Sequence, residues 1–574
     1  MLNKRSAIQD FHSIEIHQNG KPLNQAYHIR SVMIKKEINH IASARLHIAD
    51  GDPINGGYDI NDSEDLIPGV EIEVKMGYRN RNETVFKGIV VKNSLKSMEH
   101  GIPVLIVDCK DEAYKLSIHR NHRFFQEVKE SEAIEQIASE YQLKSDLEET
   151  AVTHSELIQF DISDWEWIVK RADRNGMVII LKDGEVSLKT PKVKPEADYE
   201  FTFSENILEI EAELESRYQY GQVATQAWNE NEQDISTTES NIQLTEHGDI
   251  TSQQLAEISG IRELTLVNAG SIRDEELQIL ADARAQKSQM AKIRGTIKVL
   301  GFSEIQVGDT ISLEKLSGRF NGNSFVSGIS HQINQDIWET YIQFGMPEHW
   351  WGEQPESSKK SDRSDLNEID GLHIGLVVKL ADDQNQEKIK VQIPAIDNQM
   401  DGVWARMSNL YAGEQRGVIF RPEVGDEVIL GFLDNDPEQP IILGQLHSNA
   451  YPSPIPNDDE NPEKGIVLRQ GLKLIFNEKD SNIFLGIAEN TNLSQAPGLM
   501  IAGSDSEITL QDANDNQIKL SAEGIALISK GKIALESEAE VSVDGKEIGI
   551  TADKLECMGK QSMVINSNSQ IDIG

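Results

Sequence analysis

The chain is short of cysteine, of basic residues and of long apolar runs, and each shortage excludes something. It has two cysteines in 574 residues, so neither a disulfide framework nor a thiolate metal cluster is available. Acidic residues outnumber basic ones by 95 to 55, and the formal net charge is −40. Because nucleic acids and anionic membranes bind through an excess of Lys and Arg, this balance argues against both as partners.

No apolar run approaches the roughly 18 residues that a membrane-spanning helix needs. The N-terminal segment also lacks the apolar core of a secretory signal, so we expect synthesis and folding in the cytoplasm and no signal peptide. At about 150 residues per domain, the length predicts about four domains. A content of 41 glycines and 6 % aromatics is typical of a turn-rich β protein.

A glycine-led strand, a polar loop and a second strand recur three times, at 68–91, 307–330 and 424–446. Glycine supplies the positive φ or the close backbone approach that a tight turn into a strand needs. We interpret each unit as one hairpin of three separate barrel-like domains. The alternative is that Gly-Asp turns are simply common in β proteins.

Three helices are predicted between these hairpins. The segment 131–141 has apolar residues at helical spacing, with Ser131 as its expected N-cap. Farther on, Ser163 and Glu166 form a capping box, and a third helix is expected at about 274–290. Their apolar stripes carry no ligand-type side chains, which indicates structural helices.

Short apolar-x-apolar pairs recur about every eight residues near the C-terminus. Within each repeat, two apolar residues two positions apart indicate one short strand, and the remaining residues indicate one turn. We therefore predict a β-solenoid. Its successive strands would lie on different faces and would not be hydrogen-bonded to each other. Either the same chain returns after ~24 residues to pair with itself, or strands of two other chains fill the gaps between its strands. Cys557 is expected to be a small buried apolar residue there. The predicted core residues of this needle are Ile508, Leu510, Ile518, Leu520, Ile525, Leu527, Ile533, Leu535, Val541, Val543, Ile548 and Ile550.

The sequence contains no G-x-S-x-G, H-E-x-x-H, P-loop or C-x-x-C motif. His119 and His122 lack carboxylate or cysteine partners, so no metal site is predicted there. The stretch 512–523 has calcium-loop spacing, but glutamine replaces the required glycine and strands flank it, which favours a polar turn over calcium. We predict no catalytic residue and no cofactor. The alternative of another class is a β-solenoid polysaccharide-degrading enzyme that uses paired carboxylates.

The residues of 374–448 carry the most specific pattern in the chain. This segment resembles the OB-type barrel of VgrG proteins, the trimeric spikes of type VI secretion systems, and of related phage baseplate spikes. Upstream, 163–177 is similar to an aromatic-rich helix of the family's hub, and 325–345 to the closing hairpin of its second hub barrel. One departure is Ala395 after Pro394, where many members have Pro-Trp. The residues that carry the barrel motif are Trp404, Arg406, Pro422, Gly425, Asp426, Phe432, Asp436, Pro437, Pro440 and Gly444.

The resemblance implies a mainly β fold: a hub of β-barrel domains with a small α/β insert, an OB-fold barrel, and a C-terminal intertwined triple-stranded β-helix, the needle. The expected domains are the first hub β-barrel at 1–112, an α/β hub subdomain at 113–200, the second hub β-barrel at 201–350, a linker at 351–371, the OB-fold domain at 372–450, a linker at 451–464 and the needle at 465–574.

The resemblance also implies a structural, non-enzymatic spike at the tip of a contractile injection machine. Such a spike caps the inner tube, punctures the target membrane on sheath contraction, and is secreted from the cytoplasm by the machine. The implied partners are two further copies in a homotrimer, a hexameric inner-tube protein, baseplate proteins, effector cargo, and a PAAR-type cap on a tip formed by Ile571, Ile573 and Gly574. The equivalent spike of an extracellular contractile injection particle or a phage-like tail is the alternative.

Overall fold

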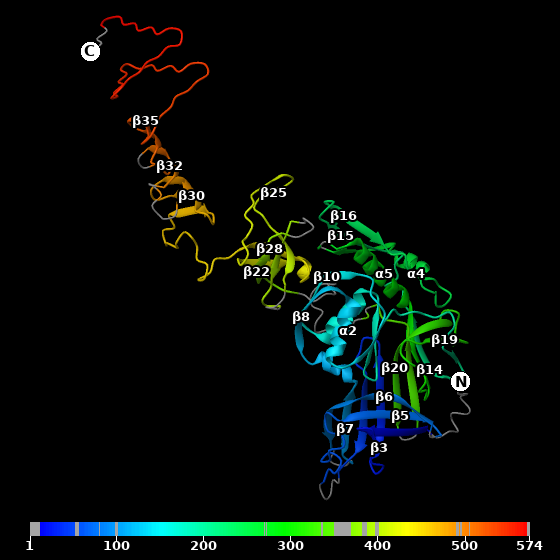
Figure 1. Ribbon diagram of the computed structural model, residues 1–574. Coiled ribbons are helices and arrows are strands. Elements are labelled where there is room, and N and C mark those ends of the chain that lie inside the picture. Colours follow the sequence, from blue (N-terminus) through cyan, green and yellow to red (C-terminus); the bar gives the residue numbers. More distant parts are fainter. Residues whose placement is uncertain are drawn as a thin grey trace. The chain divides into compact units, whose positions relative to one another are not determined.

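The computed structural model is mainly β and divides into two compact units, Met1–Leu446 and His447–Gly574 (Figure 1). The division falls at the start of the proline-rich segment that follows the last predicted barrel hairpin. The structure describes residues 12–51, 57–79, 81–97, 102–268, 270, 272–334, 337–348, 350, 369–381, 387–396, 401–488, 493, 496–503 and 506–570.

The hub is built on one 13-stranded sheet with the strand order β14-β18-β21-β20-β3-β4-β7-β6-β5-β1-β2, and β19 joins β13 to β20. Two of the predicted hairpins are present, as β5–β6 and β19–β20. The strands are β1 (His12–Gln18), β2 (Lys21–Pro22), β3 (His28–Glu37), β4 (Ser43–Ala49), β5 (Glu71–Tyr78), β6 (Arg81–Lys96), β7 (Val104–Lys110), β13 (Tyr199–Thr202), β14 (Ile207–Leu214), β18 (Ile293–Leu300), β19 (Thr310–Glu314), β20 (Gly322–Asn334) and β21 (Trp338–Phe344).

Two separate apolar cores lie along this sheet. Alternation in β5 buries Ile72, Val74 and Met76 completely, and they belong to the core formed by the N-terminal strands. The strands from 199 to 344 enclose a second core. The N-terminal strands and the strands from 199 to 344 meet where β3 and β20 pair antiparallel, with Val32 opposite Ile333. Both halves of the hub therefore share one backbone hydrogen-bond network.

A smaller α/β region follows β7. Its capping box is confirmed: the N–H of Glu166 donates to Ser163 Oγ at 3.2 Å. The predicted N-cap Ser131 is wrong, because the N-cap is Lys129, two residues earlier, and buried Ser131 bonds to Thr150 instead. The elements are η1 (Glu112–Ser117), β8 (Arg120–Lys129), α2 (Glu130–Glu140), β9 (Lys144–Leu147), β10 (Thr153–Ser163), α3 (Asp164–Arg174), β11 (Val178–Lys182) and β12 (Glu185–Lys189).

A three-stranded sheet covered by a helix completes the hub. Its strand order is β16-β15-β17, and Thr225 of β15 donates from Oγ1 to the carbonyl of Leu277 in the helix at 2.8 Å. The predicted helix at 274–290 is confirmed. Among the described residues, none of the helices combines the length and apolar character needed to cross a membrane. The elements are β15 (Gln222–Asn229), β16 (Asp234–Glu239), α4 (Ser252–Ser259), β17 (Glu263–Asn268) and α5 (Asp274–Met290).

The third predicted hairpin belongs to a closed five-stranded barrel with the order β22-β23-β24-β28-β27. A second hairpin, β25–β26, projects from the end of this barrel (Figure 1). The elements are β22 (His373–Lys379), β23 (Lys388–Gln392), β24 (Val403–Met407), β25 (Ala412–Gly413), β26 (Arg416–Gly417), β27 (Glu427–Phe432), η2 (Leu433–Asn435) and β28 (Pro440–Gln445).

The second unit contains a seven-stranded antiparallel sheet in chain order. The expectation that successive strands are not hydrogen-bonded is wrong here, because Leu510 pairs with Ile518 and Leu520 with Ile525 across adjacent strands. The described residues 529–570 contain no strand. The strands are β29 (Glu463–Val467), β30 (Leu472–Asn477), β31 (Asn482–Ile487), β32 (Gly498–Ala502), β33 (Glu507–Gln511), β34 (Gln517–Ser521) and β35 (Gly524–Ile528).

Candidate functional site

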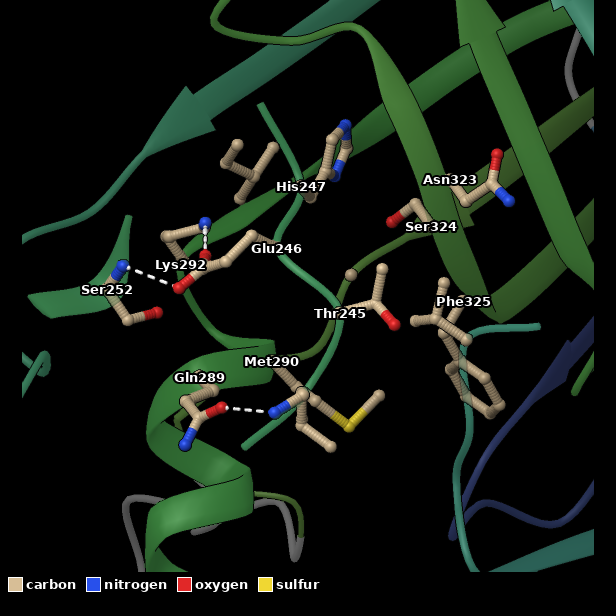
Figure 2. Close-up of a pocket in the computed structure, with 14 residues that line it drawn as sticks. Thr245, Glu246, His247, Ser252, Gln289, Met290, Lys292, Asn323, Ser324 and Phe325 are labelled. Atoms are coloured by element: carbon tan, nitrogen blue, oxygen red, sulfur yellow. Dashed lines mark hydrogen bonds and ion pairs between the residues drawn. The ribbon is translucent and has the colours of Figure 1, made fainter. Parts of the chain in front are cut away.

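The cavity shown in Figure 2 is too small for a substrate. It measures about 40 Å³, whereas a single water molecule occupies roughly 10–15 Å³ on this measure. Its charged groups already have partners: Lys292 forms an ion pair with Glu246 and donates to the carbonyl of Ile250 at 3.0 Å. A His247 ring nitrogen lies 3.1 Å from the Phe320 carbonyl oxygen, and burial lowers the pKa of His247. This arrangement indicates a structural cavity with room for a few waters.

Within the described ranges, no group of three or more His, Cys, Asp or Glu side chains is placed to hold a metal ion. His122 accepts a hydrogen bond from the backbone N–H of Asp161 at 3.3 Å. In the stretch with calcium-loop spacing, Asp512 Oδ1 accepts the N–H groups of Asn514 at 2.8 Å and Asn516 at 2.9 Å. These hydrogen bonds form a polar turn between β33 and β34.

Buried charge is concentrated where the hub meets the OB-type barrel, a contact that we call the joint. The guanidinium of Arg171, on α3, forms an ion pair with Glu438, which lies just before β28, and its side chain is 3 % exposed. It also lies over the ring of Trp167, 5.3 Å from the centroid. Breaking a buried pair leaves an uncompensated charge, so these two residues constrain how the barrel sits on the hub.

A second ionic contact comes from the β15–β16 hairpin. One carboxylate oxygen of Glu230 lies 3.0 Å from Arg406 and the other lies 3.3 Å from Lys388. Trp404, two residues before Arg406, has the ammonium groups of Lys379 and Lys390 over its ring, at 5.6 Å and 5.8 Å from the centroid. Arg406 of the Trp-x-Arg motif thus contributes to holding the barrel on the hub, whereas the Trp404 ring packs against lysines of the barrel itself.

Apolar and aromatic side chains fill the space between these charges. Ile158 of β10 is fully buried and belongs to the core of the barrel. Beside it, the Phe160 ring lies 5.6 Å from His373, which in turn lies 5.7 Å from Phe432. A strand of the hub therefore closes the barrel's core, and the two domains pack as one body at this contact.

Two carboxyl groups at the joint have raised pKa values. Burial raises the pKa of Glu156 to about 7, although its hydrogen bond to the Trp404 backbone and the nearby lysines oppose the shift. Burial, and next the negative charge of Glu438, raise the pKa of Asp436 to about 6, against the opposing charges of Arg174 and Arg171. Their ionisation at neutral pH costs stability.

The remaining barrel-motif residues form turns and strand ends. Gly425 has φ +94°, a conformation that favours glycine, and precedes β27. Asp426 accepts the N–H of Glu423 at 2.8 Å, and Asp436 accepts that of Glu438 at 2.9 Å. The others are Pro422 before the β27 turn, Phe432 at the end of β27, Pro437 in the following loop, and Pro440 and Gly444 in β28.

Sequence reasoning missed the hub side of the joint. Arg171 is three residues after Ile168 and four after Trp167, so it lies on the buried face of α3. A charged residue at such a position is almost never fully buried without a partner. That mismatch is the signal that could have predicted an ion pair, although not its partner 267 residues away.

The predicted needle-core residues fall into two groups that differ in secondary structure. Those from Ile508 to Leu527 lie in β33–β35, whereas those from Ile533 to Ile550 lie outside strands and are each 52–69 % exposed. Cys557 is also exposed, so its expected burial is wrong for the single chain. Ile571, Ile573 and Gly574, the predicted tip, lie outside the described residues.

Two family models match the chain. The Alg8 N-terminal domain matches residues 8–335, which is more than half of the chain. The type VI secretion system/phage-baseplate injector OB domain matches residues 373–447, the closed barrel.

Single relatives match over shorter stretches. The type VI secretion system spike protein VgrG3 of Vibrio cholerae is 34 % identical over 100 residues, 16 % of this chain and 10 % of that protein. The actin cross-linking toxin VgrG1 of the same species is 33 % identical over 99 residues, 16 % of this chain and 9 % of that protein. Each match spans about a tenth of the relative. A structure of the Francisella PdpA-VgrG complex, half-lidded, shares the fold with a TM-score of 0.53 and 11 % identity over 90 % of this chain and 88 % of that one.

Proposed function

The chain belongs to the Alg8 N-terminal domain family and is a VgrG-type spike protein with an injector OB domain, and from this we propose that three copies form the puncturing spike of a contractile injection machine. The hub would cap a hexameric inner tube and contact baseplate proteins. The C-terminal segment would form the leading needle, and the role is mechanical rather than enzymatic.

The observation that carries this proposal is the exposure of the alternating apolar residues after Ile528. Val541 is 54 % exposed and Val543 64 % exposed in the single chain. Burying a Val, Leu or Ile side chain is worth about 1.5–3 kcal/mol, so the needle-core residues together offer a large gain if other copies cover them. An interwound prism, in which two other chains fill the gaps between successive strands, would bury them and pair their backbones.

The joint supports a mechanical role. When a sheath drives the spike forward, force must pass between hub and barrel. The buried Arg171–Glu438 pair, the Glu230 contacts and the shared core at Ile158 tie these domains together. We propose that the joint transmits this force without the domains separating, and that membrane passage therefore requires no apolar span.

The needle tip at Ile571, Ile573 and Gly574 would carry a PAAR-type cap, with effector cargo on the cap or in the tube. Strand ends with unpaired backbone groups need a cover. Deleting residues 566–574 should abolish cap binding in a pull-down; retained binding would place the cap elsewhere. In cells, the chain would be cytoplasmic until assembly and then be secreted by the machine.

Light scattering of the intact chain tests the trimer directly. We expect three times the chain mass, and a monomeric mass would refute the proposal. Val543→Asp places a charge at a needle-core position, so on dilution the variant trimer should dissociate at a higher protein concentration than the native trimer does. Ser542→Asp, one residue away with opposite side-chain direction in a strand, is the matched control and should leave the mass unchanged.

The genomic neighbourhood distinguishes the two kinds of machine. Genes for a membrane-anchoring complex would indicate a type VI system, and genes for tail fibres and a tape measure would indicate an extracellular particle or phage-like tail. Turnover of any glycan by the purified chain would instead support the polysaccharide-degrading alternative.

A further inference from the structure

The OB-type barrel exposes two apolar surfaces. The first, the arm, is the projecting segment 408–420, where Leu410 is 96 % exposed. It forms the β25–β26 hairpin that extends beyond the end of the barrel (Figure 1). Its exposed apolar residues are Leu410, Tyr411, Val418, Ile419 and Phe420.

The second surface, the outer patch, lies on the outside of β22, β27 and β28. A Cβ built on Gly431 would lie 3.1 Å from Leu443 Cδ1 and 3.9 Å from Leu372 Cδ2, so these leucines flank a glycine that leaves the space between them open. Ile374 lies on the same outer side of β22, opposite Ile429. The exposed members of the patch are Leu372, Ile374, Leu443 and Leu446.

Charge makes both surfaces unusual in this protein. The chain has a net charge of −40, yet the stretches 372–378 and 440–446 contain no Asp, Glu, Lys or Arg. The only charged residue of β27 is Glu427, and the arm contains only Glu414 and Arg416, whose charges cancel. Two copies of so acidic a chain repel each other, and this repulsion opposes contact least where the facing surfaces carry little charge. Apolar surfaces of this kind mark interaction sites on soluble proteins.

We infer that the arm of one copy docks on the outer patch of the next copy around the trimer. A ring of three identical subunits requires two different surfaces, each of which contacts the other on a neighbour. The arm and the outer patch satisfy this requirement on one small domain, and both stay exposed within their own chain. The occupant is thus a second copy of this chain. The inference rests on the proposed trimer and assigns the contact that brings the barrels together directly ahead of the needle sequence.

The experiment places the photo-cross-linker p-benzoylphenylalanine at position 410 of the full chain. Isotope-labelled and unlabelled copies are mixed by denaturation and refolding, irradiated and analysed by peptide mass spectrometry. We expect labelled-to-unlabelled cross-links that map to 372–378 or 440–446. The same reagent at Ile118, an exposed hub residue, is the control and should give no cross-link to these segments.

Leu443→Asp in the same protein should reduce the cross-link yield at least fivefold, whereas Ile118→Asp should not change it. A trimeric mass with cross-links that map elsewhere, or only within one copy, would overturn the arm contact while leaving the spike proposal intact. A monomeric mass would overturn both.

Discussion

Glu156→Gln tests the electrostatics of the joint, because it removes a carboxyl group whose charged form the fold disfavours. The pKa of Glu156 is raised from 4.5 to about 7. The folded protein therefore binds this proton more tightly than the unfolded chain does. The stabilisation is complete below about pH 4.5 and is lost as the pH rises through about 7.

The magnitude follows from the shift. At 1.36 kcal/mol per pKa unit, ionised Glu156 costs at most about 3 kcal/mol above pH 8. Glutamine mimics the neutral carboxyl group, and the shift already includes the opposing attraction of Lys388 and Lys390, so we expect a gain of about 1–3 kcal/mol at pH 8.5 and much less at pH 5.

Differential scanning calorimetry at pH 5 and pH 8.5 provides the measurement. For a unit of this size the gain corresponds to roughly 1 °C per kcal/mol in the transition of the hub and barrel. The control is Glu135→Gln, which removes an exposed carboxyl group on α2 and should change the transition little at either pH. An equal effect of Glu156→Gln at both pH values, or destabilisation at pH 8.5, would refute the reasoning.

Three further substitutions test other features of the fold. Arg171→Met should destabilise the hub and barrel by about 3–5 kcal/mol in a denaturant titration, because it leaves Glu438 buried without its partner. The Arg171→Met/Glu438→Gln double variant should regain part of this lost stability. Gly425→Ala should cost about 1 kcal/mol from its positive φ alone, since no heavy atom lies within 4 Å of the added Cβ, and the barrel should still fold by circular dichroism. Ser163→Ala should cost about 1 kcal/mol by removing the N-cap of α3, measurable as a lower transition temperature; no change would mean that packing alone defines this helix end.

Local signals in the sequence predicted the elements that depend on local chemistry. The Ser163–Glu166 box, the helix at 274–290 and the three glycine-led hairpins are all present, because capping and turn residues act within a few positions. Ser131 failed as an N-cap because the preceding strand continues to Lys129 and Thr150 offers Ser131 another partner.

The C-terminal repeat was harder to interpret, because five residues of strand and three of turn fit two architectures. Apolar residues two positions apart occur both in a strand that forms one face of a prism-shaped β-solenoid and in a half-buried strand of a hairpin. In β33–β35 the short turns return the chain beside itself, as antiparallel connections of this length do. The joint could not be predicted either, because Arg171 and Glu438 meet only after the barrel and hub have packed.

The pairing of β3 with β20 determines how the protein can be divided for experiments. A fragment that ends near residue 112 would contain β1–β7 but would lack Ile333 and Trp338, which complete the N-terminal core. It would also leave the edge of β3 uncovered, with the N–H and C=O groups that normally meet β20 exposed along 31–37. Such an edge recruits strands from other molecules. We expect this fragment to aggregate, whereas one that extends through β21 to 346 would retain the covering strand. We therefore expect the N-terminal half of the hub to reach its native state only after residues 322–334 have been synthesised, because β20 covers the edge of β3.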